Sequence, residues 1–445
     1  MQRLRALLDR LRSSLWFVPM VLVVGSVGLA LALIEVDVGQ EWAERWPRLF
    51  GAGAAGTRAM LSAIAGSMIT VAGVVFSITV VALTLASSQY TSRILRTFMR
   101  DRWSQAVLGI FLGVYAYCLV VLRTIRGGDE GAFVPSVAVI VGVLLAFVAI
   151  GFLIFFIHHI SSSIQATSII KAAADETIAA IDRLFPHRLG EASDTGAARE
   201  IERETKHRCW QPIPAVRTGY VQGVDGPGLI GFARDRNALV RMECGVGEFI
   251  VESSPLVSLC CDEPLNEGAA AALDRIYSIG RQRTMVQDAG FGVRQIVDVA
   301  LRALSPGSND TTTAVTCVDY LTAVLARLAA RDFESPYRMD EGELRVIARG
   351  PTFQSLLDEA FDQIRQNATG NVAILRVLLR AVEVVAGRTA DAERRRALRR
   401  QAELIVEVAA RTIPVMRDYE SLEAVLKRLA LLLGGELRRT SSVGT

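Results

Sequence analysis

The most distinctive polar residues of this sequence are small or hydroxylated, and they recur within one long uncharged stretch, residues 59–92. On a helix that turns about 100° per residue, they share a sector of roughly 80°. The residues of this face are Ser62, Gly66, Thr70, Gly73, Ser77, Thr84 and Ser88. Such a face either lets helices pack closely in lipid or lines a pore in which hydroxyl groups solvate a permeating solute.

A second polar group lies in residues 305–313, after an apolar helical repeat that Pro306 and Gly307 terminate. Either of the next two polar residues can cap a following helix. Together with an upstream arginine, the hydroxyls and free amides of this turn could bind an anion; the alternative is a capped turn that only sets the angle between two helices. The site residues predicted here are Arg294, Ser305, Asn309, Asp310, Thr312 and Thr313.

Residues typical of enzyme and metal sites are sparse. There is no GxSxG, HExxH, Walker-type loop or dinucleotide fingerprint. We therefore expect no catalytic residue and no cofactor, and we rank an enzyme below the two non-enzymatic functions given at the end of this section. His158 and His159 point about 100° apart on a helix, which favours hydrogen-bonded or pH-sensing histidines over a metal site. A further charged set forms either a pocket or salt-bridged helix surfaces: Arg281, Arg283, Asp288, Arg294 and Asp298.

Composition divides the chain into one part suited to lipid and another suited to water. Long uncharged stretches fill the first 170 of its 445 residues, whereas the remainder has the charge density of a soluble protein. The net charge of +3 is too small to indicate a nucleic-acid partner. Six cysteines without a CxxC pair fit a reducing compartment for the second part.

The first part, residues 1–170, is predicted to be a membrane domain with about four transmembrane helices, near 15–34, 60–88, 104–122 and 134–158. The first span resembles a signal peptide, but its length favours an uncleaved anchor. Arginines precede the first span and separate the second from the third, so both termini are expected in the cytoplasm. We therefore expect a multi-pass protein of the bacterial inner membrane.

The second part is predicted to be cytoplasmic and of mixed α+β structure. A helical connector is expected over residues 171–210, and short runs rich in Gly, Pro and β-branched residues indicate a small β-barrel or sandwich over 211–265. Residues 266–445 show several amphipathic periods and are expected to form a helical domain.

Three stretches resemble a bacterial family of predicted membrane proteins, domain of unknown function 2254. They are AGSMITVAGVVFSITVVALTLASSQYTSRILRTFMRDR, FIHHISSSIQ and QDAGFGVRQIVDVALRALSPGSNDTTTA. The resemblance covers nearly the whole chain. The family pattern has a proline after the Asn-Asp pair, where this chain has Thr311; this difference weakens the expectation of a rigid turn but leaves the expected cap intact. It implies a membrane architecture and supplies no activity, substrate or cofactor.

From these patterns we expect a homo-oligomeric channel or channel-like transporter for an ion or small solute, gated or regulated by the cytoplasmic part. The alternative is a non-conducting, membrane-anchored ligand-binding or signalling scaffold. In either case the lipid bilayer is a partner, and the second span decides between them because it either surrounds an aqueous path or is buried against other helices.

Overall fold

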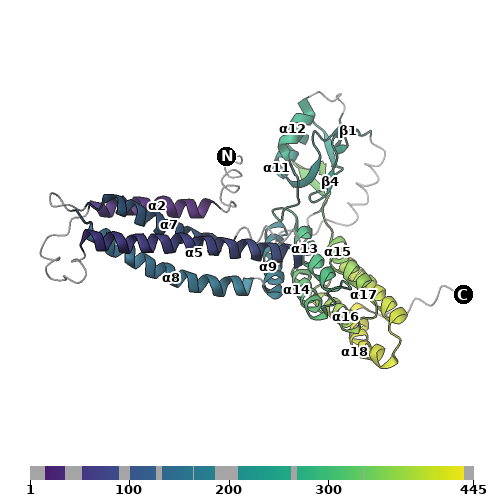
Figure 1. Ribbon diagram of the computed structural model, residues 1–445. Coiled ribbons are helices and arrows are strands. Elements are labelled where there is room, and N and C mark those ends of the chain that lie inside the picture. The colour runs from purple at the N-terminus through teal and green to yellow at the C-terminus, as the bar shows by residue number, and fades with distance from the viewer. Residues whose placement is uncertain are drawn as a thin grey trace. The chain divides into compact units, whose positions relative to one another are not determined.

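The computed structural model describes residues 16–35, 53–89, 101–126, 133–163, 165–185, 209–261, 268–333 and 335–434. The chain divides into two compact units, Met1–Ile169 and Ile170–Thr445 (Figure 1). The arginines before the first span, and those at positions 93, 96 and 100, lie outside the described residues. The predicted orientation of the chain in the membrane therefore stays a prediction.

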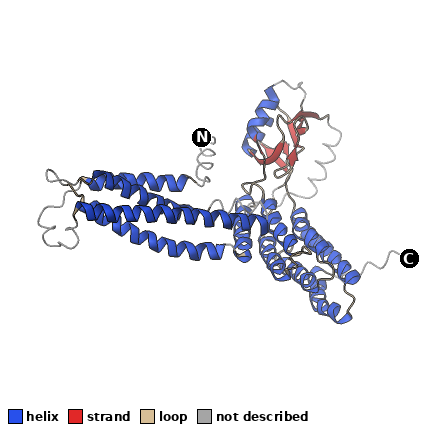
Figure 2. Cartoon of the chain, viewed as in Figure 1, coloured by secondary structure: helices blue, strands red, loops and turns tan. Residues whose placement is uncertain are grey.

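The first unit contains four long helices that run side by side (Figure 2). They are α2 (Phe17–Ile34), α5 (Ala54–Gln89), α7 (Arg102–Thr124) and α8 (Ser136–Ser163). Each is long and apolar enough to cross a membrane, and each overlaps one of the predicted spans. In α7, half of the most apolar window is buried, compared with 11% in α2. Helix α7 is thus the centre of this unit.

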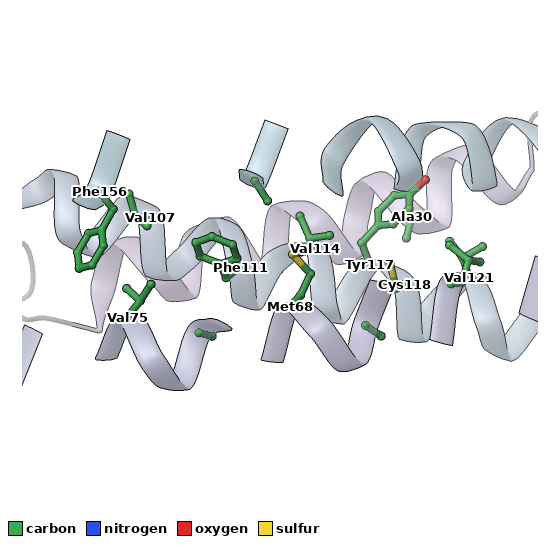
Figure 3. Packing of buried hydrophobic residues seen from close by; sticks show 14 of the residues in the cluster. Ala30, Met68, Val75, Val107, Phe111, Val114, Tyr117, Cys118, Val121 and Phe156 are labelled. Atoms are coloured by element: carbon green, nitrogen blue, oxygen red, sulfur yellow. The ribbon is translucent and has the colours of Figure 1, made fainter. Parts of the chain in front are cut away.

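The core of the first unit follows one face of α7, where large buried side chains recur every three or four residues (Figure 3). Phe111, Val114, Tyr117 and Val121 are all nearly inaccessible to solvent. The hydroxyl of Tyr117 donates a 2.6 Å hydrogen bond to the carbonyl oxygen of Ala138 at the start of α8. That bond matters because hydrocarbon offers a buried hydroxyl no alternative partner.

Two glycines bring α2 and α7 into close contact. Gly109 and Gly113 form a GxxxG pair on α7, and a Cβ atom on Gly113 would lie 2.6 Å from Oγ of Ser26 on α2. Small residues at this spacing let helix backbones approach closely in lipid. The GxxxG motif is visible in the sequence, but its contact with α2 was not predicted.

A fifth described helix also meets the criteria of length and composition for a membrane span, so the count of four is not confirmed. This is α14 (Thr311–Ala329), the least apolar of the five. It packs against α13 (Ala289–Ala303) and α16 (Val372–Ala386) within the second unit.

The β structure of the second unit comprises two sheets. One has the strand order β1-β5-β3-β8-β7 and the other β4-β2-β6. The bounds are β1 (Gln211–Pro214), β2 (Gly219–Val224), β3 (Leu239–Met242), β4 (Phe249–Ile250), β5 (Pro255–Cys260), β6 (Tyr277–Gly280), β7 (Tyr337–Asp340) and β8 (Glu343–Ile347). In the described residues the sheets do not close into a barrel. Strands β6, β7 and β8 come from the region predicted to be helical, and β8 pairs in parallel with β3.

Helices make up the rest of the second unit. Helices α11 (Gly226–Asp235) and α12 (Gly268–Ile276) lie among the strands in sequence and share their apolar core. The others are α9 (Ala166–Leu184), α13, α14, α15 (Phe353–Asn367), α16, α17 (Ala392–Thr412) and α18 (Met416–Leu433). Helices α13 to α18 form a bundle in which side-chain caps at Asp288, Asp310 and Asn371 define where α13, α14 and α16 begin.

Candidate functional site

Helix α5 has a packed face and an open face. Leu61, Ala65, Met68, Ala72 and Val75 are buried at heptad-like spacing, and α5 packs mainly against α7. The predicted small-residue face lies on the other side: Ser62, Gly66, Thr70, Gly73, Ser77 and Thr84 are exposed. Ser88 belongs to α5, but its side chain lies outside the described residues.

Within the part of the chain that the structure describes, no other helix covers this open face at its glycines. A Cβ atom added to Gly66 or Gly73 would find nothing within 4 Å. The close approach that small residues permit is therefore not used here by the described residues of the same chain, in contrast to Gly109 and Gly113 on α7.

The hydroxyl protons of the two threonines on this face are satisfied within the helix. Thr70 Oγ1 donates to the carbonyl oxygen of Gly66 at 2.8 Å, and Thr84 Oγ1 donates to that of Val80 at 2.9 Å. Each hydroxyl oxygen keeps lone pairs as acceptors. The α5 face, defined as the small and hydroxylated residues listed above, thus combines small size with acceptor groups and carries no charge.

The turn between α13 and α14 is built around Asp310. Its carboxylate accepts hydrogen bonds from the backbone nitrogen of Thr313 at 3.0 Å and from Oγ1 of the same residue at 2.6 Å. These bonds lower the pKa of Asp310 below its ordinary value. Asn309 adopts a left-handed conformation with φ of 44°, which asparagine tolerates better than most residues. Ser305 Oγ donates to the carbonyl oxygen of Arg302.

This geometry favours the capped-turn interpretation over an anion site. A carboxylate already occupies the amino-terminal end of α14, so an external anion would have to displace it. Thr311 Oγ1 accepts a 3.0 Å hydrogen bond from Nδ2 of Asn371, which ties the turn to the start of α16. Thr312 is exposed in the first turn of α14.

Arg294 belongs to a different group of charges. Its Nε donates to Asp298 Oδ1 at 2.8 Å on the same helix, and among its described contacts none involves the turn. Arg283 forms a bidentate salt bridge with the buried carboxylate of Asp288: its Nε donates to Oδ2 at 2.8 Å and its Nη2 donates to Oδ1 at 3.0 Å. Four of the five charged residues singled out in the sequence thus form two salt bridges.

Glu359 of α15 interacts electrostatically with the residues of these two salt bridges and was not anticipated from the sequence. Burial raises the pKa of its carboxyl group, and the charges of Asp288 and Asp298 add to the rise, while Arg283 and Arg294 oppose it. A carboxyl group whose pKa is raised beside arginines is a frequent feature of functional sites, although structural ion pairs produce it too. No sequence signal marks Glu359, because only the packing of α15 on α13 brings it to these arginines.

Replacing Glu359 with glutamine is expected to stabilise the protein near neutral pH. Because the folded pKa lies above the unfolded one, ionising this carboxyl group costs stability as the pH rises through both values. Glutamine removes that cost, and we expect a rise in Tm of about 1–3 °C at pH 7 that disappears below about pH 4. Thermal unfolding of the full chain in detergent across this pH range measures it. A lower Tm for the variant at pH 7 would contradict burial as the dominant cause.

Comparisons with known proteins show which family the chain is similar to. Residues 12–384 match the model of a family described as predicted membrane protein (DUF2254). Uncharacterized proteins of Mycobacterium tuberculosis strains CDC 1551 and H37Rv and of Mycobacterium bovis are each 35% identical to this chain over 455 aligned positions. The alignments cover 100% of this chain and 83% of each relative. No solved structure matches it.

Proposed function

The chain belongs to the DUF2254 family of predicted membrane proteins, and we propose that it is a homo-oligomeric inner-membrane channel or channel-like transporter. In this proposal α2, α5, α7 and α8 cross the bilayer, α14 stays with the second unit, and both termini are cytoplasmic. The second unit acts as the gate or sensor. The solute is an ion or another small solute.

The observation that carries this proposal is the open α5 face. An apolar exposed face would be explained by lipid alone, as with Ile154 and Phe147 of α8, each 67% exposed. The α5 face instead presents exposed hydroxyl groups, and glycines that no described helix of the same chain covers. In hydrocarbon, such a face is stabilised most by close contact with the backbone of another copy or by contact with water in a lumen.

The test is to replace Gly73 with leucine. Because nothing lies within 4 Å of its added Cβ, we expect the fold of the single chain to be unaffected. Crowding at an interface or in a lumen should instead lower ion flux in proteoliposomes by about tenfold or more, or dissociate the oligomer. Flux, together with the mass of the detergent-solubilised assembly, measures both effects.

The matched control is Gly151→Leu on α8. Gly151 is also exposed in a predicted span and has nothing within 4 Å, but it does not belong to a row of hydroxylated residues. We expect this variant to behave like the wild type. Equal flux and equal mass for both variants and the wild type would refute a role of the α5 face.

A second candidate function is the non-conducting, membrane-anchored ligand-binding or signalling scaffold. The charged group of Glu359 with Arg283 and Arg294 supports it, because a half-buried carboxyl group beside arginines can bind a polar ligand. Replacing Arg294 with alanine should then abolish partner or ligand capture and leave membrane permeability unchanged. A wild-type protein that conducts ions through an α5-dependent path excludes this alternative.

A further inference from the structure

At one end of the first unit, the beginning of α7 and the end of α8 are joined by a pair of titratable residues. Nε2 of His159 lies 2.8 Å from Oδ2 of Asp101. Their side chains are 22% and 21% exposed. The pair is therefore shielded from most of the solvent but remains within reach of protons from water.

Asp101 is held in place by α7. Its Oδ1 accepts from the backbone nitrogen of Trp103 at 3.1 Å, and its Oδ2 accepts from Oγ of Ser104 at 2.6 Å. The amino-terminal end of a helix favours a negative charge because its first backbone N–H groups are unpaired. Asp101 is thus a fixed anion that faces α8.

His159 is held in place by aromatic neighbours. Its ring stacks on Phe155, with centroids 5.7 Å apart and an interplanar angle of 11°, and Phe155 meets the edge of Trp103 at 5.2 Å. His159 also lies near the carboxyl end of α8, where unpaired carbonyl groups favour a positive charge. Both side chains of the pair are therefore fixed by groups of their own helices.

Among the described residues, few other charges face the pair. Arg102 and His158 are its neighbours in sequence, and both are exposed. The only charged residue of α5 is Arg58, which donates to the carbonyl oxygen of Ile125 beyond the opposite end of α7. Helix α2 carries no charged residue. Within the described helices of this unit, Asp101 is the only acidic residue in contact with His159.

From this geometry we propose that His159 and Asp101 form a pH-operated latch between α7 and α8. Histidine changes its charge between about pH 5 and 8. As an imidazolium, His159 makes a charge-assisted bond to Asp101, which is about twice as strong as a bond from a neutral donor. The latch is closed at acidic pH and loosened at alkaline pH, immediately before the chain leaves α8 and enters α9.

Hydrogen exchange of the full-length protein in lipid nanodiscs tests the latch without requiring conduction. We expect the protection factors of backbone amides in residues 157–163, corrected for intrinsic exchange, to fall about 5- to 10-fold between pH 5.5 and pH 8. In His159→Gln the protection is low at both pH values. Protection in His159→Gln that keeps the wild-type level and pH dependence overturns the proposal.

Two further variants separate the latch from general damage. Asn caps a helix about as well as Asp, so Asp101→Asn retains the cap of α7 but removes the charge, and it should abolish the pH dependence. The control is His158→Gln, the exposed neighbouring histidine, which should behave like the wild type. Loss of the pH dependence in His158→Gln, or its persistence in Asp101→Asn, contradicts the latch.

The consequence for solute flow rests on the proposed channel function. If the protein conducts, we expect the pH dependence of flux to disappear in His159→Gln together with that of protection. Protection that depends on pH and His159 in a protein without any flux supports the latch and contradicts the channel. Flux in a protein whose protection depends neither on pH nor on His159 supports the channel and contradicts the latch.

Discussion

Replacing Gly109 with valine is expected to separate α2 from α7 and to destabilise the first unit by about 1–3 kcal/mol or more. A Cβ atom at this position would lie 2.9 Å from the backbone Cα of Pro19 and 2.7 Å from Cδ1 of Leu22. The Leu22 methyl group can rotate away, but the Pro19 backbone moves only with the whole of α2. In lipid, close packing is the main attraction between apolar helices, so the increased separation is not compensated.

Unfolding of the full-length protein in mixed detergent micelles, followed by circular dichroism, measures this loss. The control is Gly25→Val on α2, because Gly25 is exposed and an added Cβ there meets nothing within 4 Å. We expect the control to unfold at the same detergent composition as the wild type. Equal stability of the two variants would show that α2 and α7 do not pack through Gly109.

Replacing Gly292 with alanine is expected to destabilise the second unit by about 2–3 kcal/mol. The added Cβ atom would overlap with Oγ1 of Thr177 on α9 and would lie 2.9 Å from its Cβ. Thr177 is fully buried, and its hydroxyl donates to the carbonyl oxygen of Ala173 at 2.6 Å. Rotation of the threonine side chain moves Oγ1 but not Cβ, so α9 itself must shift.

The sign of this effect is diagnostic, because Gly to Ala within a helix normally stabilises by about 0.5–1 kcal/mol. Gly231→Ala on α11 should show that ordinary gain, since nothing lies within 4 Å of its added Cβ. Thermal unfolding of the full chain compares the two variants. Adding Thr177→Ala to Gly292→Ala should recover part of the loss, and additive effects in the double variant would exclude direct contact.

The candidate sites were predictable to different degrees. The residues of the α5 face lie on one side of a helix as the spacing predicts, because helical periodicity alone decides which residues share a face. The capping role of Asp310 was also predictable, since a cap depends on residues within one turn. By contrast, Glu359 lies far in sequence from Arg283 and Arg294, and no local pattern indicates that burial raises its pKa.

The β structure shows the same distinction. Residues 211–260 contain the strands expected from their composition, but β7 and β8 complete the larger sheet from residues 337–347. The parallel pairing of Val240 with Val346 joins segments separated by α12, α13 and α14. Pairing at such distance depends on the whole chain and is not encoded in the short strands themselves.

The sequence by itself determined four of the five described helices that are long and apolar enough to cross a membrane, a helix cap at Asn309 or Asp310, and the family that the chain resembles. These properties depend on neighbouring residues or on similarity along the chain. Only the tertiary structure decided which face of α5 is packed, that Gly109 and Gly113 receive α2, and that His159 meets Asp101. Each of these contacts joins residues that are distant in sequence, and packing of whole helices brings them together.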